Sequence, residues 1–365
     1  MTVSLCIVAY NEHSALPSLF KDILSQTYDP GLVELVFADS ASTDDTRELF
    51  AGFREKYRER YLDILLVDNP RKKQAAGWNE AIRASSGDII IRLDAHASIP
   101  ADFIEKNVRL IESGEYVCGG ARPNNIESPT PYREMLLLAE SSMFGSSFAG
   151  YRREGEGKKY VSSLFHGAYR REVFARAGGF DVSLGRTEDN ELHYRIRQNG
   201  FRICQSSDII SYQNIRPTLR KMLSQKFGNG LWIGLTLGKC PGCLSVFHFA
   251  PFCFVTALAA SLVCAAVSAA TASFWLLMPL LIVGGAYLAA DLLMSGAAFI
   301  SAEKKNAFML LLPFIFPLLH IVYGAGTVTG LVRLPFWKRS LDGSEIREIG
   351  EVAKAAGEKM KNKNV

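Results

Sequence analysis

The sequence predicts an α/β domain built on a mostly parallel sheet, followed by a membrane region. Short apolar runs rich in β-forming residues alternate with helical patterns along the first half of the chain, which is typical of βα units. Residues 240–290 contain no Asp, Glu, Lys or Arg, and a second charge-free run covers residues 306–332. A helix needs roughly 20 apolar residues to cross a bilayer. The first run is therefore long enough for two crossings and the second for one.

The α/β pattern begins at the amino end and is predicted to fill residues 1–213. Val3–Ala9 is a strand-like run, and residues 14–26 place apolar side chains at helical spacing. Strand and helix patterns then alternate over Leu32–Ala38, Asp44–Tyr57, Leu62–Val67, Gln74–Ala84 and Asp88–Leu93. A polar, glycine-rich segment at residues 150–159 is expected to be a loop close to a substrate.

Residues 241–332 are predicted to form the membrane region. The expected segments are about 246–268, 274–298 and 307–331. Basic residues precede the first segment and follow the second, which places both ends in the cytoplasm by the positive-inside rule. Basic residues also follow the third segment, so a simple crossing there conflicts with the rule. A re-entrant hairpin broken at Pro313 and Pro317 and a crossing that violates the rule both stay open.

Two charged segments flank the membrane region. Residues 214–240 are basic with apolar positions at helical spacing, which predicts an interfacial helix on an anionic leaflet, with an ordinary surface helix as the alternative. Residues 333–365 are predicted to be a charged cytoplasmic or flexible tail. The amino end has no pattern typical of a signal peptide, so the polar domain is expected to face the cytoplasm.

Polar and acidic residues follow the predicted strands, where open α/β sheets bind their ligands. Five such stretches occur in order: Val8–Glu12, Phe37–Asp44, Ile90–His96, His166-Gly167 with Gly178–Phe180, and Thr187–Leu192. Carboxylate and imidazole groups suit a divalent metal that neutralises charge on a leaving diphosphate. Each stretch is a weak signal alone, since an acidic first turn is also favoured by the helix dipole. Their order in one chain is the stronger observation.

With these stretches in this order, the sequence resembles the inverting glycosyltransferases of family two, and in particular bacterial exopolysaccharide glucosyltransferases of the succinoglycan type. The resemblance covers about residues 2–235 by motif and the membrane segments by architecture. It implies a GT-A catalytic domain, which is Rossmann-like with a mostly parallel sheet, followed by C-terminal transmembrane helices.

The resemblance also implies a donor site and a metal. The residues that match nucleotide-sugar-binding positions are Ala9, Tyr10, Asn11, Glu12, Asp39, Lys72, Asn79 and Asp94. Asp94 and His96 match the family's metal triplet, which is usually Asp-x-Asp. Imidazole is a softer ligand than carboxylate, so the departure at His96 favours Mn²⁺ over Mg²⁺. The alternative is that His96 contacts phosphate and Asp94 alone holds the metal.

Asp189 matches the family's catalytic base, with Glu188 as the alternative. Inversion by direct displacement needs a carboxylate that takes the proton of the attacking hydroxyl. Asp44 is expected to have a structural capping role. The residues expected on the acceptor side are His166, Gly167, Gln225 and Trp232. For Trp232 a role as a membrane anchor is equally consistent with the sequence.

The resulting hypothesis is transfer of one sugar, with glucose favoured, from a UDP-sugar to a lipid-linked saccharide in bacterial exopolysaccharide synthesis. The protein is then a multi-pass protein of the inner membrane with a cytoplasmic catalytic domain and no nucleic-acid partner. Transfer directly to polyprenyl phosphate and a non-catalytic, nucleotide-binding membrane protein are the alternatives. A processive synthase is disfavoured because Gln225 and Trp232 are too far apart for its Gln-x-x-Arg-Trp motif.

Overall fold

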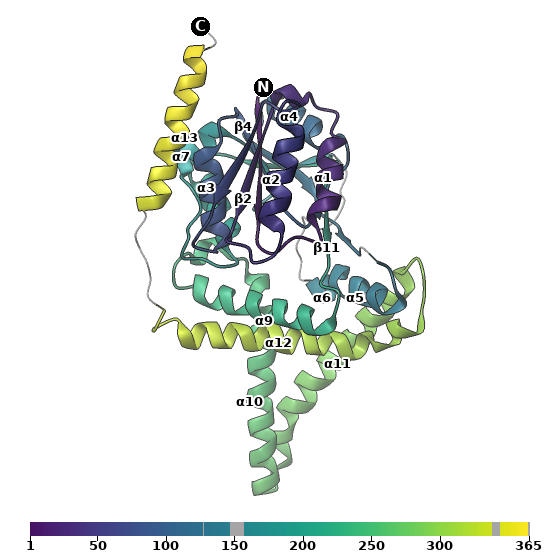
Figure 1. Ribbon diagram of the computed structural model, residues 1–365. Coiled ribbons are helices and arrows are strands. Elements are labelled where there is room, and N and C mark those ends of the chain that lie inside the picture. Colours follow the sequence, from purple (N-terminus) through teal and green to yellow (C-terminus); the bar gives the residue numbers. More distant parts are fainter. Residues whose placement is uncertain (127, 147–156, 338–343, 364–365) are drawn as a thin grey trace. The chain divides into compact units, whose positions relative to one another are not determined.

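A computed structural model describes residues 1–126, 128–146, 157–337 and 344–363 (Figure 1). The chain divides into two compact units, and each takes up segments that are distant in sequence. The first comprises the described parts of Met1–Pro123, Gly150–Gln213 and Arg339–Val365, and the second those of Asn124–Ala149 and Asn214–Lys338. Most of the predicted loop at 150–159 lies outside the described residues.

The first unit is built on an eight-stranded sheet in the order β3-β2-β1-β4-β9-β6-β10-β8. Its strands are β1 (Val3–Ala9), β2 (Val33–Asp39), β3 (Asp63–Asp68), β4 (Ile89–Asp94), β6 (Val117–Ala121), β8 (Lys158–Tyr160), β9 (Ala168–Arg170) and β10 (Ile203–Ile210). The first four strands in chain order are parallel, and β10 is parallel to β6, whereas β9 runs antiparallel to β4 and β6. The predicted mostly parallel sheet is confirmed.

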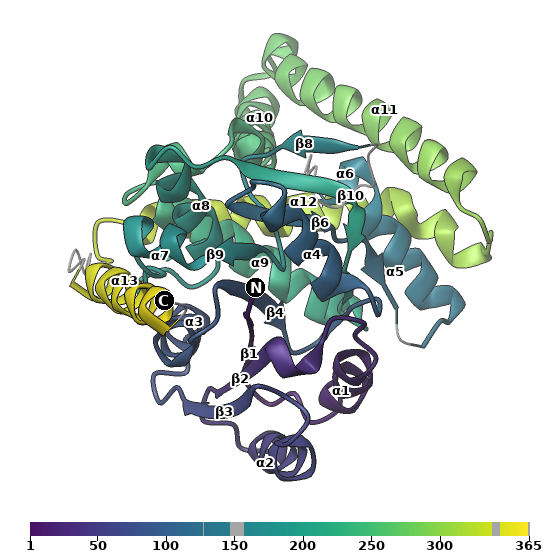
Figure 2. The same cartoon turned by 90° about the horizontal axis from the view of Figure 1, so that it is seen from above.

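Helices cover both faces of this sheet (Figure 2). One face holds α1 (Leu16–Leu24), α2 (Thr46–Tyr57) and α4 (Phe103–Glu112), and the other holds α3 (Gln74–Ala84), α7 (Arg171–Ala177) and α8 (Glu188–Gln198). Side chains of a strand alternate between faces. Leu5 and Ile7 of β1 therefore enter one core and Cys6 enters the other. A short strand, β5 (Ala97–Ser98), pairs with β11 (Tyr212–Asn214) beside the sheet.

The carboxyl-terminal helix α13 (Ser344–Lys363) belongs to the first unit and lies beside α7 and α3 (Figure 1). Ile349 and Ala353 are fully buried in the same core as Trp78 and Phe174. The sequence predicted only a charged or flexible tail here. The apolar positions of this helix are few, and their partners lie more than 150 residues earlier, so the pattern of the tail alone gave no sign of docking.

The second unit is helical. It contains β7 (Asn124–Asn125), α5 (Pro131–Ser141), α6 (Met143–Ser146), α9 (Leu219–Thr236), α10 (Ala250–Thr271), α11 (Met278–Ser301) and α12 (Leu312–Arg333). Three helical segments are long and apolar enough to cross a membrane: Val246–Thr271, Phe274–Ser301 and Ala307–Arg333. They match the three segments predicted from the sequence.

The close approach of α3 to β1 depends on Gly77. A Cβ atom at this position would lie 2.6 Å from Val8 Cγ1 and 3.0 Å from Asn69 Nδ2. We expect Gly77→Ala to destabilise the protein by about 1–3 kcal/mol through overpacking. The measurement is the midpoint of thermal unfolding in detergent. Gly52→Ala in α2 is the matched control, because nothing lies within 4 Å of the added atom. It should raise the midpoint, and equal effects of the two changes would contradict the packing argument.

Candidate active site

The candidate site lies at the carboxyl ends of three neighbouring parallel strands. Asp39 ends β2 and Asp94 ends β4, on either side of β1. In the sheet register, Ala9 lies opposite Asp39 and Val8 lies opposite Asp94. The predicted strand-end stretches therefore meet at one edge of the sheet, where open α/β sheets place their ligands.

Asn11 joins the end of β1 to the loop that follows β2. Its backbone has φ of 56°, a left-handed conformation that asparagine tolerates better than most residues. Its side-chain oxygen accepts a hydrogen bond from Thr43 N at 2.8 Å, and its own N–H donates to Ser42 Oγ at 3.0 Å. Asp44 accepts from the backbone N–H of Thr46 at 3.1 Å, at the start of α2, although the N-cap position itself is Asp45. Asn11 therefore shapes the loop and has little capacity left for a ligand.

Two side chains of the expected donor site face solvent together. Tyr10 is half-exposed, and the exposed Lys72 places Nζ 5.8 Å from the centre of the Tyr10 ring. Asp39, at the end of β2, is buried. Its Oδ1 accepts a hydrogen bond from Ser42 N at 3.3 Å. An aromatic ring, an ammonium group and a carboxylate at one strand edge supply stacking, charge and hydrogen bonding for a nucleotide.

Asn79 does not have the predicted role. Its side chain is fully buried, its Oδ1 accepts from Phe180 N at 2.7 Å, and its Nδ2 donates to Phe180 O at 2.9 Å and Glu345 Oε1 at 3.0 Å. All its hydrogen-bonding capacity is directed at protein groups. Asn79 therefore fixes the turn at Gly178–Phe180 and α13, and it does not contact a nucleotide in this conformation.

Asp94 is the most strongly held carboxylate at this edge. Its Oδ2 lies 3.4 Å from His166 Nε2, and its Oδ1 lies 3.9 Å from Arg92 Nη2 and accepts from Gln74 Nε2 at 3.4 Å. Burial alone would raise the pKa of Asp94, but His166, Arg92 and His96 hold that pKa far below its usual range. Asp94 is therefore an anion at every physiological pH.

Arg92 is the residue that the sequence analysis missed. It lies in β4 two positions before Asp94, on the same face of the sheet, and its side chain is buried. Its guanidinium lies 4.8 Å from the Trp78 ring centre and 5.6 Å from that of Phe180. The signal in the sequence was an arginine inside an otherwise apolar strand, because a buried arginine requires partners.

Those partners are the acids at the start of α8. Glu188 and Asp189 are both buried, and Arg92 is the basic group that acts on both of them. Burial and the charge of Asp189 raise the pKa of Glu188 to about 7. Burial also raises the pKa of Asp189, against the opposing effect of Arg92. The structure thus brings Asp94, Glu188 and Asp189 to one arginine, as their order in the chain suggested.

A divalent cation fits these residues. Asp94, Glu188 and Asp189 are buried and all act electrostatically on the Arg92 guanidinium, so these four groups carry an excess of negative charge when the acids are ionised. Glu188 Oε2 is buried with no hydrogen-bond partner in the described part of the chain. Hard divalent cations take carboxylate oxygens as ligands. No cluster of three or more His, Cys, Asp or Glu in metal-binding arrangement occurs among the described residues, so further ligands would come from the diphosphate.

His96 is held in an orientation that suits a metal ligand. Its Nδ1 lies 3.0 Å from Glu12 Oε1, and its Nε2 lies 3.2 Å from Gln213 Nε2. A carboxylate only accepts hydrogen bonds, so a neutral ring carries its hydrogen on Nδ1 and its lone pair on Nε2. A carboxylate that orients the ring in this way is typical of metal-bound histidines. Glu12 therefore acts through His96, and Gln213 would have to yield for Nε2 to bind a metal.

His166 lies on the donor side, not the acceptor side as expected. Its side chain is buried, its Nε2 faces Asp94, and its Nδ1 lies 2.8 Å from Ser211 Oγ. Burial lowers the pKa of His166, although Asp94 opposes this. The ring therefore contacts the Asp94 carboxylate and restricts its position. Gly167 follows at the strand edge, where its carbonyl oxygen accepts from Arg92 N at 3.0 Å.

Gln225 and Trp232 lie on α9 in the second unit. Trp232 packs edge-on against Trp337, with ring centres 6.1 Å apart. Their acceptor-side role stays a prediction.

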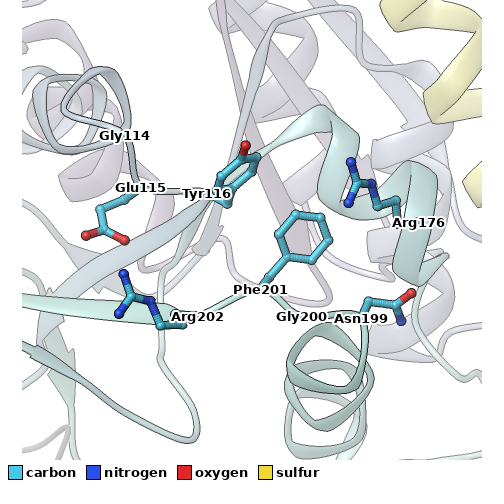
Figure 3. A pocket seen from close by; sticks show the side chains of 8 residues that line it. All are labelled: Gly114, Glu115, Tyr116, Arg176, Asn199, Gly200, Phe201 and Arg202. Atoms are coloured by element: carbon cyan, nitrogen blue, oxygen red, sulfur yellow. The ribbon is translucent and has the colours of Figure 1, made fainter.

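A cavity at the other end of the sheet is a separate feature. Its volume is about 290 Å³, and it lies where β6 and β10 begin, away from the carboxyl ends of the parallel strands (Figure 3). Its lining residues are Gly114, Glu115, Tyr116, Arg176, Asn199, Gly200, Phe201 and Arg202. None of the predicted site residues belongs to it.

Comparison with known proteins identifies the family. Residues 4–178 match the profile of glycosyl transferase family 2. The chain carries a family 2 glycosyltransferase domain. The succinoglycan biosynthesis protein ExoA of Rhizobium meliloti (strain 1021) is 29% identical over 236 residues, which cover 63% of this chain and 68% of ExoA.

Two further proteins extend the comparison. An undecaprenyl-phosphate 4-deoxy-4-formamido-L-arabinose transferase of Yersinia pestis (strain Pestoides F) is 33% identical over 215 residues, 54% of this chain and 61% of that protein. The solved mannosyltransferase PcManGT of Pyrobaculum calidifontis, a complex with GDP-Man and Mn²⁺, superposes with a TM-score of 0.56 at 19% identity over 92% of this chain and 88% of that one. The predicted GT-A fold is confirmed, and the protein is a nucleotide-sugar glycosyltransferase.

The raised pKa of Glu188 predicts a pH-dependent stability. The group's ordinary pKa is 4.5 and its pKa in the fold is about 7. Ionisation therefore opposes folding, and the wild type loses stability as the pH rises through this window. Gln cannot ionise, so Glu188→Gln should gain stability over the wild type between pH 4.5 and 7, by up to about 3 kcal/mol. The comparison uses thermal unfolding in detergent with a chelator present. A difference that stays constant from pH 4.5 to 8 would contradict the assignment.

Proposed function

We propose that this enzyme transfers one sugar from a UDP-sugar, with glucose favoured, to a lipid-linked saccharide at the cytoplasmic face of a bacterial inner membrane. The observation that carries the proposal is the gathering of Asp94, Glu188 and Asp189 around the buried Arg92 at the carboxyl edge of the sheet. The similarity to ExoA, a succinoglycan biosynthesis protein, supports exopolysaccharide synthesis as the setting.

In the proposed reaction, Asp189 is the general base. The acceptor hydroxyl attacks the anomeric carbon, its proton passes to the Asp189 carboxylate, and the bond from the anomeric carbon to the diphosphate oxygen breaks as UDP leaves. Arg92 favours the ionised form of Asp189, while burial raises the pKa of the carboxyl group toward the range useful for a base. Glu188 shares this environment and is the alternative base.

Asp94 and His96 would hold a divalent metal, with Mn²⁺ favoured by the imidazole ligand. When bound, the metal supplies positive charge that stabilises the leaving diphosphate. His166 keeps Asp94 oriented, and Glu12 does the same for His96. On the donor side, Tyr10 provides an aromatic surface for the base, and Lys72 provides a positive charge near it.

Transfer directly to polyprenyl phosphate is the second candidate. The similar Yersinia protein is an undecaprenyl-phosphate 4-deoxy-4-formamido-L-arabinose transferase. In this chain, the first turn of α9 exposes Arg220 and Lys221, whose positive charges suit a phosphate group. The two candidates differ in their product. A panel of radiolabelled UDP-sugars incubated with membranes distinguishes them, because only one yields a sugar linked directly to the lipid phosphate.

Loss of the Asp189 carboxylate should stop transfer without abolishing donor binding. We expect Asp189→Asn to lower kcat by about 10²–10⁴-fold, the range for a general base, because the amide accepts no proton at neutral pH. The measurement is UDP release by purified protein in detergent with Mn²⁺, UDP-glucose and lipid-linked acceptor. UDP affinity, measured by calorimetry, should change little.

The matched control is Glu188→Gln, which leaves Asp189 in place. A large kcat loss in that variant together with full turnover by Asp189→Asn would transfer the base assignment to Glu188. Full turnover by both variants would overturn the mechanism.

A further inference from the structure

The third apolar segment has a different environment from the other two. Only 6% of the most apolar window of each of the first two segments is buried inside the protein, against 33% for Ala307–Arg333. In Figure 1, α12 lies alongside α9 and across α10. Its surroundings within the second unit decide whether it crosses a bilayer.

Helices α9 and α12 run parallel to each other, and glycines at their interface allow close packing. A Cβ atom at Gly230 would lie 2.0 Å from Tyr323 O, and one at Gly234 would lie 2.6 Å from Thr327 O. On the other helix, a Cβ atom at Gly330 would lie 2.2 Å from Leu231 O. These contacts involve main-chain atoms, so neither helix can move away from the other without losing the packing.

The partners of α12 carry charge. Arg220 and Lys221 in the first turn of α9 are exposed, and Lys226 of the same helix forms a buried ion pair with Glu140 of α5, with Nζ 2.9 Å from Oε2. Glu134 of α5 accepts from Asn306 Nδ2 at 3.1 Å, just before the apolar segment. A crossing by α12 would carry the Lys226–Glu140 pair beside it into the hydrocarbon region, where ionisable side chains are unfavourable.

Most exposed side chains of α12 are apolar. The large ones are Phe314, Leu318, Ile321 and Val332, and the exposed Arg333 ends the helix. The spacing of four and three residues places Phe314, Leu318 and Ile321 on one side of the helix. This apolar side suits acyl chains, and the basic first turn of the partner helix α9 suits the lipid headgroups.

We propose that α12 lies in the plane of the membrane surface with α9, and that only the α10–α11 hairpin crosses the bilayer. Lys304 and Lys305 before α12 and Arg333 at its end are then on the same side, so the conflict with the positive-inside rule disappears. The occupant of the apolar side is the lipid leaflet. The proposal rests on the proposed membrane attachment and goes beyond it by fixing the number of crossings at two.

Cysteine labelling of the full chain in proteoliposomes tests this topology. In a background that lacks Cys240, Cys243, Cys253 and Cys264, single cysteines replace Lys304 and Phe336, on either side of α12. An impermeant maleimide should label both from the same side of the vesicle. Labelling from opposite sides would overturn the proposal. Release of the protein by carbonate would instead refute membrane attachment itself.

Depth measurements then separate a flat helix from a re-entrant one. Nitroxide labels on cysteines at Phe314, Ile321 and Val332 should report the same shallow depth when relaxed by oxygen and a nickel chelate. A label at Ile321 that is deeper than both others would overturn the flat arrangement in favour of a re-entrant hairpin.

A second inference concerns α13 and rests on different contacts. Both carboxylate oxygens of Glu345 accept from the Arg71 guanidinium at 2.7 Å, and Oε1 also accepts from Asn79 Nδ2. Such paired bonds have a fixed geometry and are stronger than bonds between neutral groups. Arg71 belongs to the loop between β3 and α3, next to Lys72.

That loop and the first residue of α3 each supply one group to the donor side. Lys72, with φ of 56°, faces Tyr10, and Gln74 donates to Asp94 at 3.4 Å. Lys73 between them donates from Nζ to Val182 O at 3.0 Å. A left-handed conformation in a lysine is unfavourable unless the surroundings impose it. The Arg71–Glu345 pair holds the residue directly before Lys72.

We infer that Glu345 is a positioning residue for the donor, acting through Arg71 on the loop that carries Lys72. This inference rests on the proposed donor site. Glu348 offers a control on the same helix, because it pairs with Arg83 of α3 at 3.0 Å and reaches Arg71 only indirectly, through Arg83 and Glu80. Removing either pair weakens the docking of α13, but only one of them should alter donor binding.

We expect Glu345→Gln to raise the donor KM roughly tenfold, the size expected for loss of a charge-assisted pair, with kcat within about twofold of wild type. Glu348→Gln should leave both constants unchanged and lower the unfolding midpoint less than Glu345→Gln does, because the Glu348 side chain is more exposed. Adding Arg71→Ala to Glu345→Gln should not raise the KM beyond that of Arg71→Ala alone.

Equal donor KM values for the two glutamate variants would overturn the inference. A wild-type protein that fails to bind UDP-sugar at all would instead refute the proposed function, so the two failures are distinguishable.

Discussion

The buried guanidinium of Arg92 is the group on which the rest of the site depends. An arginine inside a sheet is stable only if anions neutralise it and flat groups cover it. Asp94 comes from its own strand, Glu188 and Asp189 act on it from the start of α8, and Trp78 and Phe180 supply the rings. Groups from α3, α8 and the turn before Phe180 thus converge on one charge in β4. The same charge favours ionisation of the acids that the proposed reaction uses.

The strand ends could be predicted from the sequence because they depend on local patterns. Val3–Ala9 was predicted with its correct bounds, and Asp39 and Asp94 ended their strands as expected. What a side chain contacts depends on residues far away in the chain, and a local pattern does not contain that information. Asn79 and His166 both lie near the predicted site. Their partners, Glu345 and Ser211, come from segments that the motifs did not include, and these partners decide their roles.

The membrane region shows the same limit. Length and hydropathy predicted three apolar segments, and the structure contains three such helices. Neither property contains information about the neighbours of a helix. The glycines of α9 and α12 look like weak helix formers in the sequence. In the fold they permit main-chain contact between a basic helix and an apolar one. In the arrangement that we propose, the charge of the partner helix keeps the apolar helix at the membrane surface, which no property of residues 307–331 alone reveals.

The catalytic unit is completed by a segment that follows the membrane region in the chain. Ile349 and Ala353 fill the same core as Trp78, the ring that covers Arg92, and Glu345 fixes the loop beside the donor side chains. Because α13 lies in this core, the order of the donor side depends on residues that follow the apolar helices in the chain.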